Sequence, residues 1–132
     1  MRMSKFPSPE HHIKGWGWED WITNNPNYCG KILHFRKGGT FSLHYHIKKD
    51  ETFYVLSGLF RGEFYGSLRS YNEGKKQEVI LCSGKIVHIK PGLIHRLSAL
   101  EAGNIIEFST QHFEDDSYRL EPGDSQRQNK NV

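Results

Sequence analysis

The chain has 132 residues, of which 36% are hydrophobic and 25% charged, a composition that is typical of one globular domain and excludes an intrinsically disordered chain. The formal net charge is only +3 and no dense basic stripe is present, so we expect no nucleic-acid partner. No apolar run approaches the roughly 20 residues of a membrane span, and the N-terminus lacks a stretch typical of a signal peptide, so we expect a cytoplasmic protein without a membrane partner.

Residues 1–28 are expected to form an irregular N-terminal arm that packs on the rest of the protein. The segment GWGWEDWI at residues 15–22 is interrupted by glycine too often for a helix and is too aromatic for a solvated linker. Its tryptophans, Trp16, Trp18 and Trp21, are expected to fill the core or a dimer interface, and stacking on a sugar is the alternative.

Short apolar runs alternate with turn residues between residues 29 and 112. Aromatic and β-branched residues are abundant in these runs, and turn signals follow roughly every 8–12 residues, which is typical of an all-β sandwich or barrel. About eight strands are expected, over residues 31–35, 40–47, 51–57, 59–68, 78–82, 85–89, 95–100 and 105–110. We therefore predict a single β-barrel domain over residues 29–112.

The remaining residues, 113–132, are expected to form a C-terminal extension and tail. A short helical or irregular cap is predicted up to residue 124, followed by a loose tail over residues 125–132. The two cysteines, Cys29 and Cys82, form no CxxC motif, so neither a disulfide scaffold nor a cysteine zinc site is expected. Each is interpreted as a small buried apolar residue in a strand.

Four side chains in the predicted barrel have the chemistry of metal ligands. Side chains alternate between the two faces of a strand, so His44 and His46 project to the same side. Glu51 opens the following strand, and His95 begins a later one. Three neutral imidazoles and one carboxylate form a ligand set for one divalent transition metal ion, and Zn²⁺, Mn²⁺, Fe²⁺ and Ni²⁺ all suit it.

The other histidines do not share this pattern. We interpret His34 and His88 as ordinary core or surface residues of their strands. His11, His12 and His112 lie in segments without a regular pattern, and no role is assigned to them.

The spacing of the first three ligand candidates resembles the first motif of the cupins. That motif begins and ends with glycine, and here it runs from Gly38 through His44, His46 and Glu51 to Gly58. The resemblance implies a double-stranded β-helix, a jelly-roll-like barrel with the metal in its mouth. It also implies that the histidine pair and the glutamate are metal ligands.

The second cupin motif follows further along the chain. It runs from Gly84 through Gly92 to His95, which the resemblance makes the fourth ligand. Lys90 stands where the motif has its proline, and Ala99 replaces the distal asparagine. Because that asparagine is not a ligand, the metal prediction is unaffected by its absence.

Three further segments are similar to the cupin domain of type II mannose-6-phosphate isomerases. They are GWGWEDW near the start, KPGLIHRLSALEAGN around His95, and IIEFST with EDDSYRL near the end. His44 stands where that family commonly has glutamine, and the tail diverges after Arg119. This resemblance implies an aldose–ketose isomerase that acts on a sugar or sugar phosphate.

Such a reaction needs a base that moves a proton between two neighbouring carbons. Glu107 in the run IIEFS is the first candidate, and a structural, ion-paired role is its alternative. Tyr54 is the second candidate, and Tyr65 could serve in its place.

A phosphorylated substrate would also need a cation. Arg96 follows the ligand His95 as in the isomerase family, and Lys31 and Lys85 lie on predicted barrel strands. Because adjacent residues on a strand face opposite sides, a structural role for Arg96 is the alternative.

Two other functions fit the same metal site. One is an Fe(II)-dependent cupin dioxygenase, and the other is a non-catalytic module that binds a metal and a sugar. A structural cupin that keeps its metal for stability is a further possibility. In each case the resemblance implies a homodimer, which agrees with the tendency of small barrels to pair through their exposed edge strands.

Overall fold

The computed structural model describes residues 6–128, so the predictions for residues 1–5 and 129–132 lie outside it. Eleven strands and two short helices are formed in this range. The first six strands are β1 (Glu10–Lys14), β2 (Gly17–Asn24), β3 (Cys29–Phe35), β4 (Leu43–Tyr45), β5 (Glu51–Val55) and β6 (Leu59–Tyr65). The others are β7 (Gln77–Cys82), β8 (Ile86–Ile89), β9 (Ile94–Glu101), β10 (Gly103–Ser109) and β11 (Tyr118–Glu121), and the helices are α1 (Leu68–Asn72) and α2 (Asp124–Gln128).

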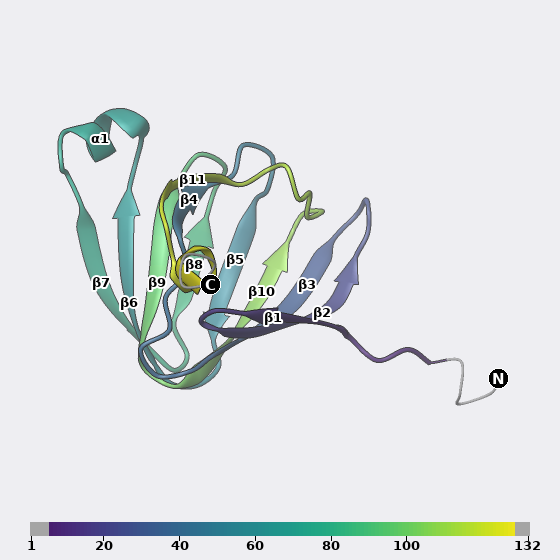
Figure 1. Cartoon of the computed structure of the whole chain (residues 1–132). Coiled ribbons are helices and arrows are strands. Elements are labelled where there is room, and N and C mark those ends of the chain that lie inside the picture. The colour runs from purple at the N-terminus through teal and green to yellow at the C-terminus, as the bar shows by residue number, and fades with distance from the viewer. Residues whose placement is uncertain (1–5, 129–132) are drawn as a thin grey trace.

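The strands form two antiparallel sheets that face each other (Figure 1). One sheet has six strands in the order β1-β2-β3-β10-β5-β8, and the other has five in the order β11-β4-β9-β6-β7. The eight strands expected between residues 29 and 112 correspond to β3 to β10. The predicted all-β, jelly-roll-like fold is therefore confirmed.

Both helices are too short to cross a membrane, and the described residues contain no helix long and apolar enough to do so. Helix α1 forms where a polar turn was expected between β6 and β7. The Ser67 hydroxyl accepts a hydrogen bond from the Ser70 amide, which satisfies a free donor at the start of the helix.

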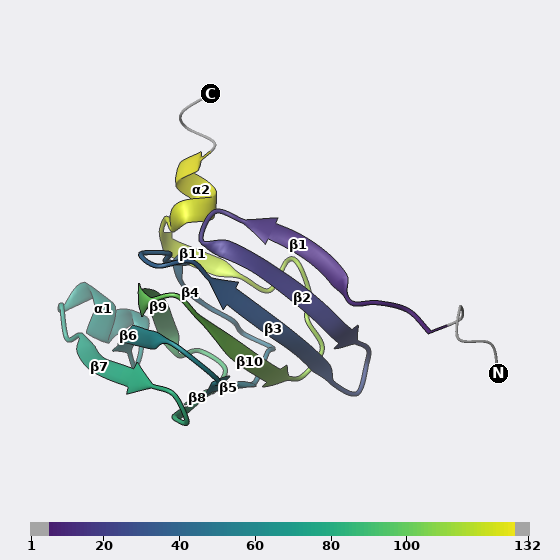
Figure 2. The ribbon, with the colours of Figure 1, turned by 90° about the horizontal axis from the view of Figure 1, so that it is seen from below.

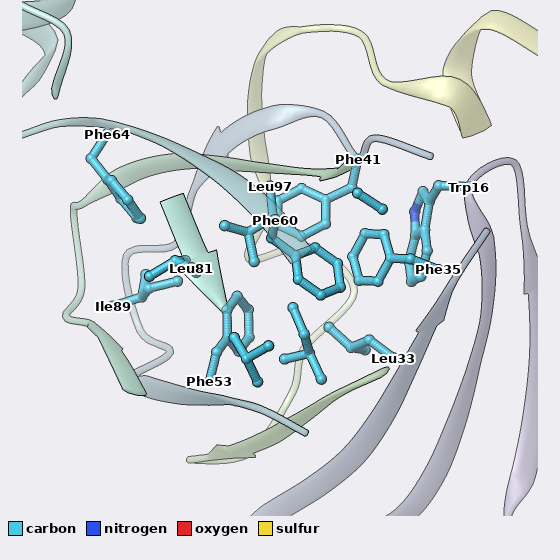
Figure 3. Close-up of a cluster of buried hydrophobic side chains, with 13 residues drawn as sticks. Trp16, Leu33, Phe35, Phe41, Phe53, Phe60, Phe64, Leu81, Ile89 and Leu97 are labelled. Carbon is cyan, nitrogen blue, oxygen red and sulfur yellow. The ribbon is translucent and has the colours of Figure 1, made fainter. Parts of the chain in front are cut away.

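The space between the sheets is filled by one hydrophobic cluster of alternate strand residues (Figure 3). In β3, for example, Leu33 and Phe35 are buried while His34 between them is partly exposed. Trp16 stacks on Phe35 with ring centroids 4.4 Å apart. The prediction that a tryptophan of the N-terminal segment fills the core thus holds for Trp16.

The N-terminal segment is more regular than the sequence predicted. Strands β1 and β2 form a hairpin that extends the six-stranded sheet next to β3 (Figure 2). Gly17, one of the glycines that argued against a helix in this segment, is a requirement of this pairing. A Cβ atom at Gly17 would lie 1.8 Å from the carbonyl oxygen of His34, so only glycine lets β2 approach β3 so closely.

The C-terminal segment also differs from the expected cap and tail. Strand β11 pairs with β4 at the edge of the five-stranded sheet. Residues 125–128, which were expected to belong to the loose tail, are part of helix α2. The Gly15 amide donates a 2.9 Å hydrogen bond to the Ser125 hydroxyl, which attaches α2 to the N-terminal hairpin. Both chain extensions therefore pack on the same end of the barrel (Figure 2).

The two cysteines are both free, and they differ in burial. Cys29 is buried as predicted, but Cys82 is exposed, contrary to the expectation of a buried residue. Cys82 lies at the end of β7, an edge strand in which only Leu81 is buried.

Candidate metal centre

Neighbouring strands bring the four predicted ligands to one place inside the barrel. His44 on β4 and His95 on β9 occupy directly opposite positions of the antiparallel pair, so their side chains share a face. His46 follows the end of β4, and Glu51 is the first residue of β5 in the facing sheet. The predicted convergence of these residues from separate strands is therefore observed.

The ligand atoms lie close enough to share an ion. One ring nitrogen from each of His44, His46 and His95 lies within 4.8 Å of the others. Oε2 of Glu51 lies 3.2 Å from Nε2 of His46 and 3.6 Å from Nε2 of His95. This spacing suits donors arranged around one transition metal ion at about 2.1 Å each.

Two atoms of this group lack a hydrogen-bond partner although both are fully buried. They are Oε2 of Glu51 and Nε2 of His95. An unsatisfied buried polar atom is rare in proteins because it loses its hydration without compensation. A divalent cation between these two lone pairs would compensate both, so the residues fit a metal ion.

The three imidazoles are also held in the tautomer that a metal requires. Nδ1 of His44 donates to the Ser42 carbonyl oxygen at 2.7 Å, and Nδ1 of His95 donates to that of Leu93 at 2.9 Å. Nδ1 of His46 donates to a third backbone carbonyl at 2.6 Å. With the proton on Nδ1, each neutral ring presents its Nε2 lone pair to the centre.

Burial keeps the rings of His44 and His95 neutral. It lowers the pKa of His44 well below its ordinary value, and the neighbouring imidazoles and the guanidinium of Arg119 add to the effect. It also lowers the pKa of His95, against the opposing effect of the Glu51 carboxylate. Neutral imidazole is the form that binds a metal ion.

Asp116 supports this centre and was not identified from the sequence. Its backbone carbonyl accepts the hydrogen bond from His46, and its carboxylate accepts bonds from the amides of Ile47, Lys48 and Lys49 at 2.9 to 3.2 Å. Burial raises the pKa of Asp116, but the three amide bonds outweigh it and the net shift is downward. The loop that carries His46 is thus fastened to the C-terminal segment.

The metal ligands line a cavity of about 140 Å³. Two residues with predicted substrate or catalytic roles, Lys31 and Glu107, also line it. Others were not identified as cavity residues from the sequence: Lys14, Glu19, Ser42, Lys49, His112, Glu114, Ser117, Arg119, Ser125 and Gln126.

Glu107 and Lys49 form a buried ion pair in this cavity. Nζ of Lys49 lies 2.7 Å from Oε2 of Glu107, and both side chains are about 95% buried. Burial raises the pKa of Glu107, but the ammonium groups of Lys49 and Lys31 outweigh it and hold that pKa well below its ordinary value. Lys49 is in turn kept charged against its own burial by Glu107 and Glu51.

Lys31 lies on another wall of the cavity and is buried. Its ammonium group is 4.1 Å from the ring centroid of Trp21 and 3.7 Å from Oε1 of Glu19. Trp21 therefore faces the cavity, whereas Trp18 is 40% exposed and stacks on His34 outside it.

Arg96 does not reach the cavity, so its predicted contact with a substrate phosphate is not supported. It follows the inward-facing His95 on β9 and therefore points to the outer face. There its guanidinium binds Glu63 at 2.7 Å and Glu121 at 3.2 Å. The structural alternative considered for Arg96 describes this arrangement.

The other predicted substrate and catalytic residues also lie elsewhere. Lys85 is exposed in the turn between β7 and β8. Tyr54 lies on the opposite face of β5 from Glu51 and Phe53, which line the cavity. Tyr65 packs against Tyr71 with ring centroids 5.1 Å apart, also outside the cavity.

The remaining histidines follow the sequence interpretation with one exception. His34 contacts Asn104 and Asp20 on the outer face of the six-stranded sheet, and His88 contacts Asp50 at the surface. His112 lines the cavity, although it was given no role. Its Nδ1 accepts a 3.1 Å hydrogen bond from Lys49, and burial lowers its pKa to about 3.

The sequence matches the profile of the Cupin family over residues 21–125. The fold is similar to that of CapF, a capsular polysaccharide assembling protein from Staphylococcus aureus (TM-score 0.75, 22% identity), over 92% of this chain and 35% of that one. This chain thus spans about a third of the length of CapF.

Two further solved structures have similar folds. An RmlC-like cupin from Shewanella frigidimarina (TM-score 0.67, 19% identity) aligns over 87% of this chain and 92% of its own. Oxalate decarboxylase from Bacillus subtilis (TM-score 0.71, 18% identity) aligns over 91% and 31%, respectively. No protein of curated function matches the sequence.

Proposed function

This chain belongs to the cupin family, and on that premise we propose that it is a metal-dependent enzyme that interconverts the aldose and ketose forms of a sugar or sugar phosphate. One observation carries the proposal: His44, His46, His95 and Glu51 turn their free donor atoms toward one another at the wall of a cavity. The sequence similarity to type II mannose-6-phosphate isomerases supports the choice of reaction.

The four ligands would hold one divalent ion, for which Zn²⁺, Mn²⁺, Fe²⁺ and Ni²⁺ are the candidates. Such an ion would polarise the carbonyl oxygen and the neighbouring hydroxyl oxygen of a sugar. This would acidify the hydrogen on the hydroxyl-bearing carbon next to the carbonyl. The isomerisation then needs a protein base that removes this proton and returns it to the adjacent carbon.

Glu107 is the proposed base because, of the predicted candidates, it alone lines the cavity. Lys49 keeps its carboxylate ionised, so it is ready to accept a proton at neutral pH. The same pairing weakens it as a base, so the substrate must be strongly acidified for transfer to occur. Lys31, the one predicted phosphate-binding cation that lines the cavity, would contact oxygen atoms of the substrate.

A non-catalytic metal- and sugar-binding module is the second candidate. The pairing of Glu107 with Lys49 favours it, because a carboxylate in a close ion pair is a poor base. The two candidates differ in turnover and agree in metal binding. The homodimer expected from the sequence stays a prediction under both.

The test is elemental analysis of the purified chain, followed by NMR in D₂O with that metal restored. Mannose 6-phosphate, fructose 6-phosphate, mannose and fructose are each incubated with the protein, and loss of the C2 or C1 proton signal is followed. The proposal predicts proton exchange with at least one of the two aldose–ketose pairs. The Glu107→Gln variant should show no exchange but should keep the metal. Absence of exchange with all four sugars would reject the isomerase and favour the binding module.

A further inference from the structure

We propose that Arg119 binds an anionic group, a phosphate or a carboxylate, of the molecule that occupies the cavity beside the metal ligands. This inference rests on the proposed function only in taking the cavity as the substrate site. It assigns the anion to strand β11, in place of the predicted Arg96 on the outer face of β9.

The register of β11 places Arg119 next to the metal ligands. Arg119 is directly opposite His44 in the antiparallel pair of β11 and β4. Residues opposite each other in such a pair share a face of the sheet, with Cβ atoms about 5 Å apart. The preceding pair confirms this orientation: the rings of Tyr118 and Tyr45 stack at 5.2 Å and do not line the cavity.

Arg119 also differs from the deeper cations of the cavity in having no carboxylate to neutralise it. Lys49 pairs with Glu107 at 2.7 Å, and Lys31 lies 3.7 Å from Glu19. Among residues 6–128, no carboxylate lies within the 4.0 Å of an ion pair from Arg119.

Two neighbours complete the charge distribution at this cavity. Lys14, at the end of β1, lines it and likewise has no ion-pair partner in the described part of the chain. Glu114, the carboxylate that lines the cavity from the C-terminal segment, is 85% exposed and lies 3.6 Å from His112. The cavity is thus lined by as many carboxylates as lysine and arginine side chains, and a bound divalent cation would make the total positive.

The chemistry of arginine narrows the ligand class. A guanidinium presents parallel N–H donors that match the oxygens of a phosphate or a carboxylate, and it stays charged at any physiological pH. Arg119 is exposed enough to exchange its hydration for a ligand, yet it lies on the strand next to a metal ligand. A small molecule with one anionic group and neighbouring oxygen atoms would therefore contact Arg119 and the metal centre together.

The test measures equilibrium binding of two probes, inorganic phosphate and acetate, to the zinc-loaded full chain by calorimetry at fixed ionic strength. The variants are Arg119→Ala and Arg119→Lys. Arg61→Ala serves as a matched control, because Arg61 is also exposed but projects from the outer face of β6. Zinc content is measured for every protein.

The wild-type chain is expected to bind at least one probe, and the preferred probe identifies phosphate or carboxylate as the anion. Arg119→Ala should weaken that binding about tenfold or more, as expected for a lost charge-assisted hydrogen bond. Arg119→Lys should retain part of the affinity, and Arg61→Ala all of it, with zinc content unchanged throughout. Equal binding by Arg119→Ala and the wild type, or binding of neither probe by the wild type, would overturn the inference.

This measurement is independent of turnover. If phosphate or acetate binding depends on Arg119 but no sugar shows proton exchange, the isomerase proposal fails and the anion site stands. If the sugars show proton exchange but the binding of phosphate and acetate does not depend on Arg119, the isomerase proposal stands and the anion site is rejected.

Discussion

The backbone carbonyl of Asp116 accepts a 2.6 Å hydrogen bond from Nδ1 of His46, although the two residues are 70 positions apart in the sequence. The carboxylate of the same aspartate holds three successive amides of the loop after His46. One residue of the C-terminal segment therefore fixes both the tautomer of a ligand and the loop that carries it.

Replacing Asp116 with alanine is expected to weaken metal binding by about 10- to 100-fold, the usual effect of removing a group that orients a ligand. The carbonyl remains in this variant, but the amide contacts that position it are lost. Zinc affinity would be measured by competition with a chromogenic chelator. Asp115→Ala is the control. Asp115 precedes Asp116 but its side chain is exposed, so this variant should bind zinc like the wild type. Equal affinities in the two variants would show that Asp116 does not position His46.

Replacing Lys49 with methionine is expected to destabilise the chain by about 3–5 kcal/mol, because the Glu107 carboxylate would stay buried without its cation. Lys31 lies near enough to compensate in part, so the lower end of this range is expected. Urea unfolding would give the free-energy change. Lys37 provides the comparison. It pairs with Glu101 at 3.9 Å, and both side chains are more than 60% exposed. Lys37→Met should therefore change the free energy of unfolding by about 0–1 kcal/mol. Similar losses in both variants would contradict the buried ion pair.

His112 is expected to make the metal-free protein less stable in acid. Its pKa is about 3 in the folded chain and returns to the ordinary 6.5 on unfolding, so the unfolded state binds more protons between these values. The free energy of unfolding should therefore fall as the pH is lowered from about 6.5 toward 3. Replacing His112 with glutamine should reduce this slope, measured by urea unfolding at several pH values. His88→Gln, which changes an exposed histidine, should leave it unchanged, and an unaltered slope in His112→Gln would refute the explanation.

The metal ligands could be predicted from the sequence because their geometry is mostly local. The alternation of side chains on a strand forces His44 and His46 to one side whatever the rest of the fold does. Glu51 and His95 required the cupin spacing in addition, since their approach depends on which strands pair.

The same alternation explains two predictions that the structure does not support. Arg96 is next to His95 and Tyr54 is next to Phe53, so each must face away from the cavity. The resemblance to a family suggested Arg96, but strand geometry alone places its side chain on the outer face.

Other features depend on pairing between distant segments and left no local pattern. Asp116 and Arg119 acquire their contacts only because β11 pairs with β4, and nothing in EDDSYRL distinguishes the buried acid from its neighbours. The β1–β2 hairpin was missed because the glycines of GWGWEDWI were interpreted only as interruptions of a helix, whereas tertiary packing requires glycine at position 17.

The most direct test of the account is the metal content of the wild-type chain, His46→Ala and His34→Ala. Each protein would be dialysed against excess zinc, freed of unbound metal and measured by mass spectrometry of its elements. We predict about one zinc ion per chain in the wild type and in His34→Ala, whose imidazole lies outside the barrel, and loss of zinc in His46→Ala. A wild-type chain without zinc, or equal zinc in the two variants, would contradict a metal centre built from His44, His46, Glu51 and His95.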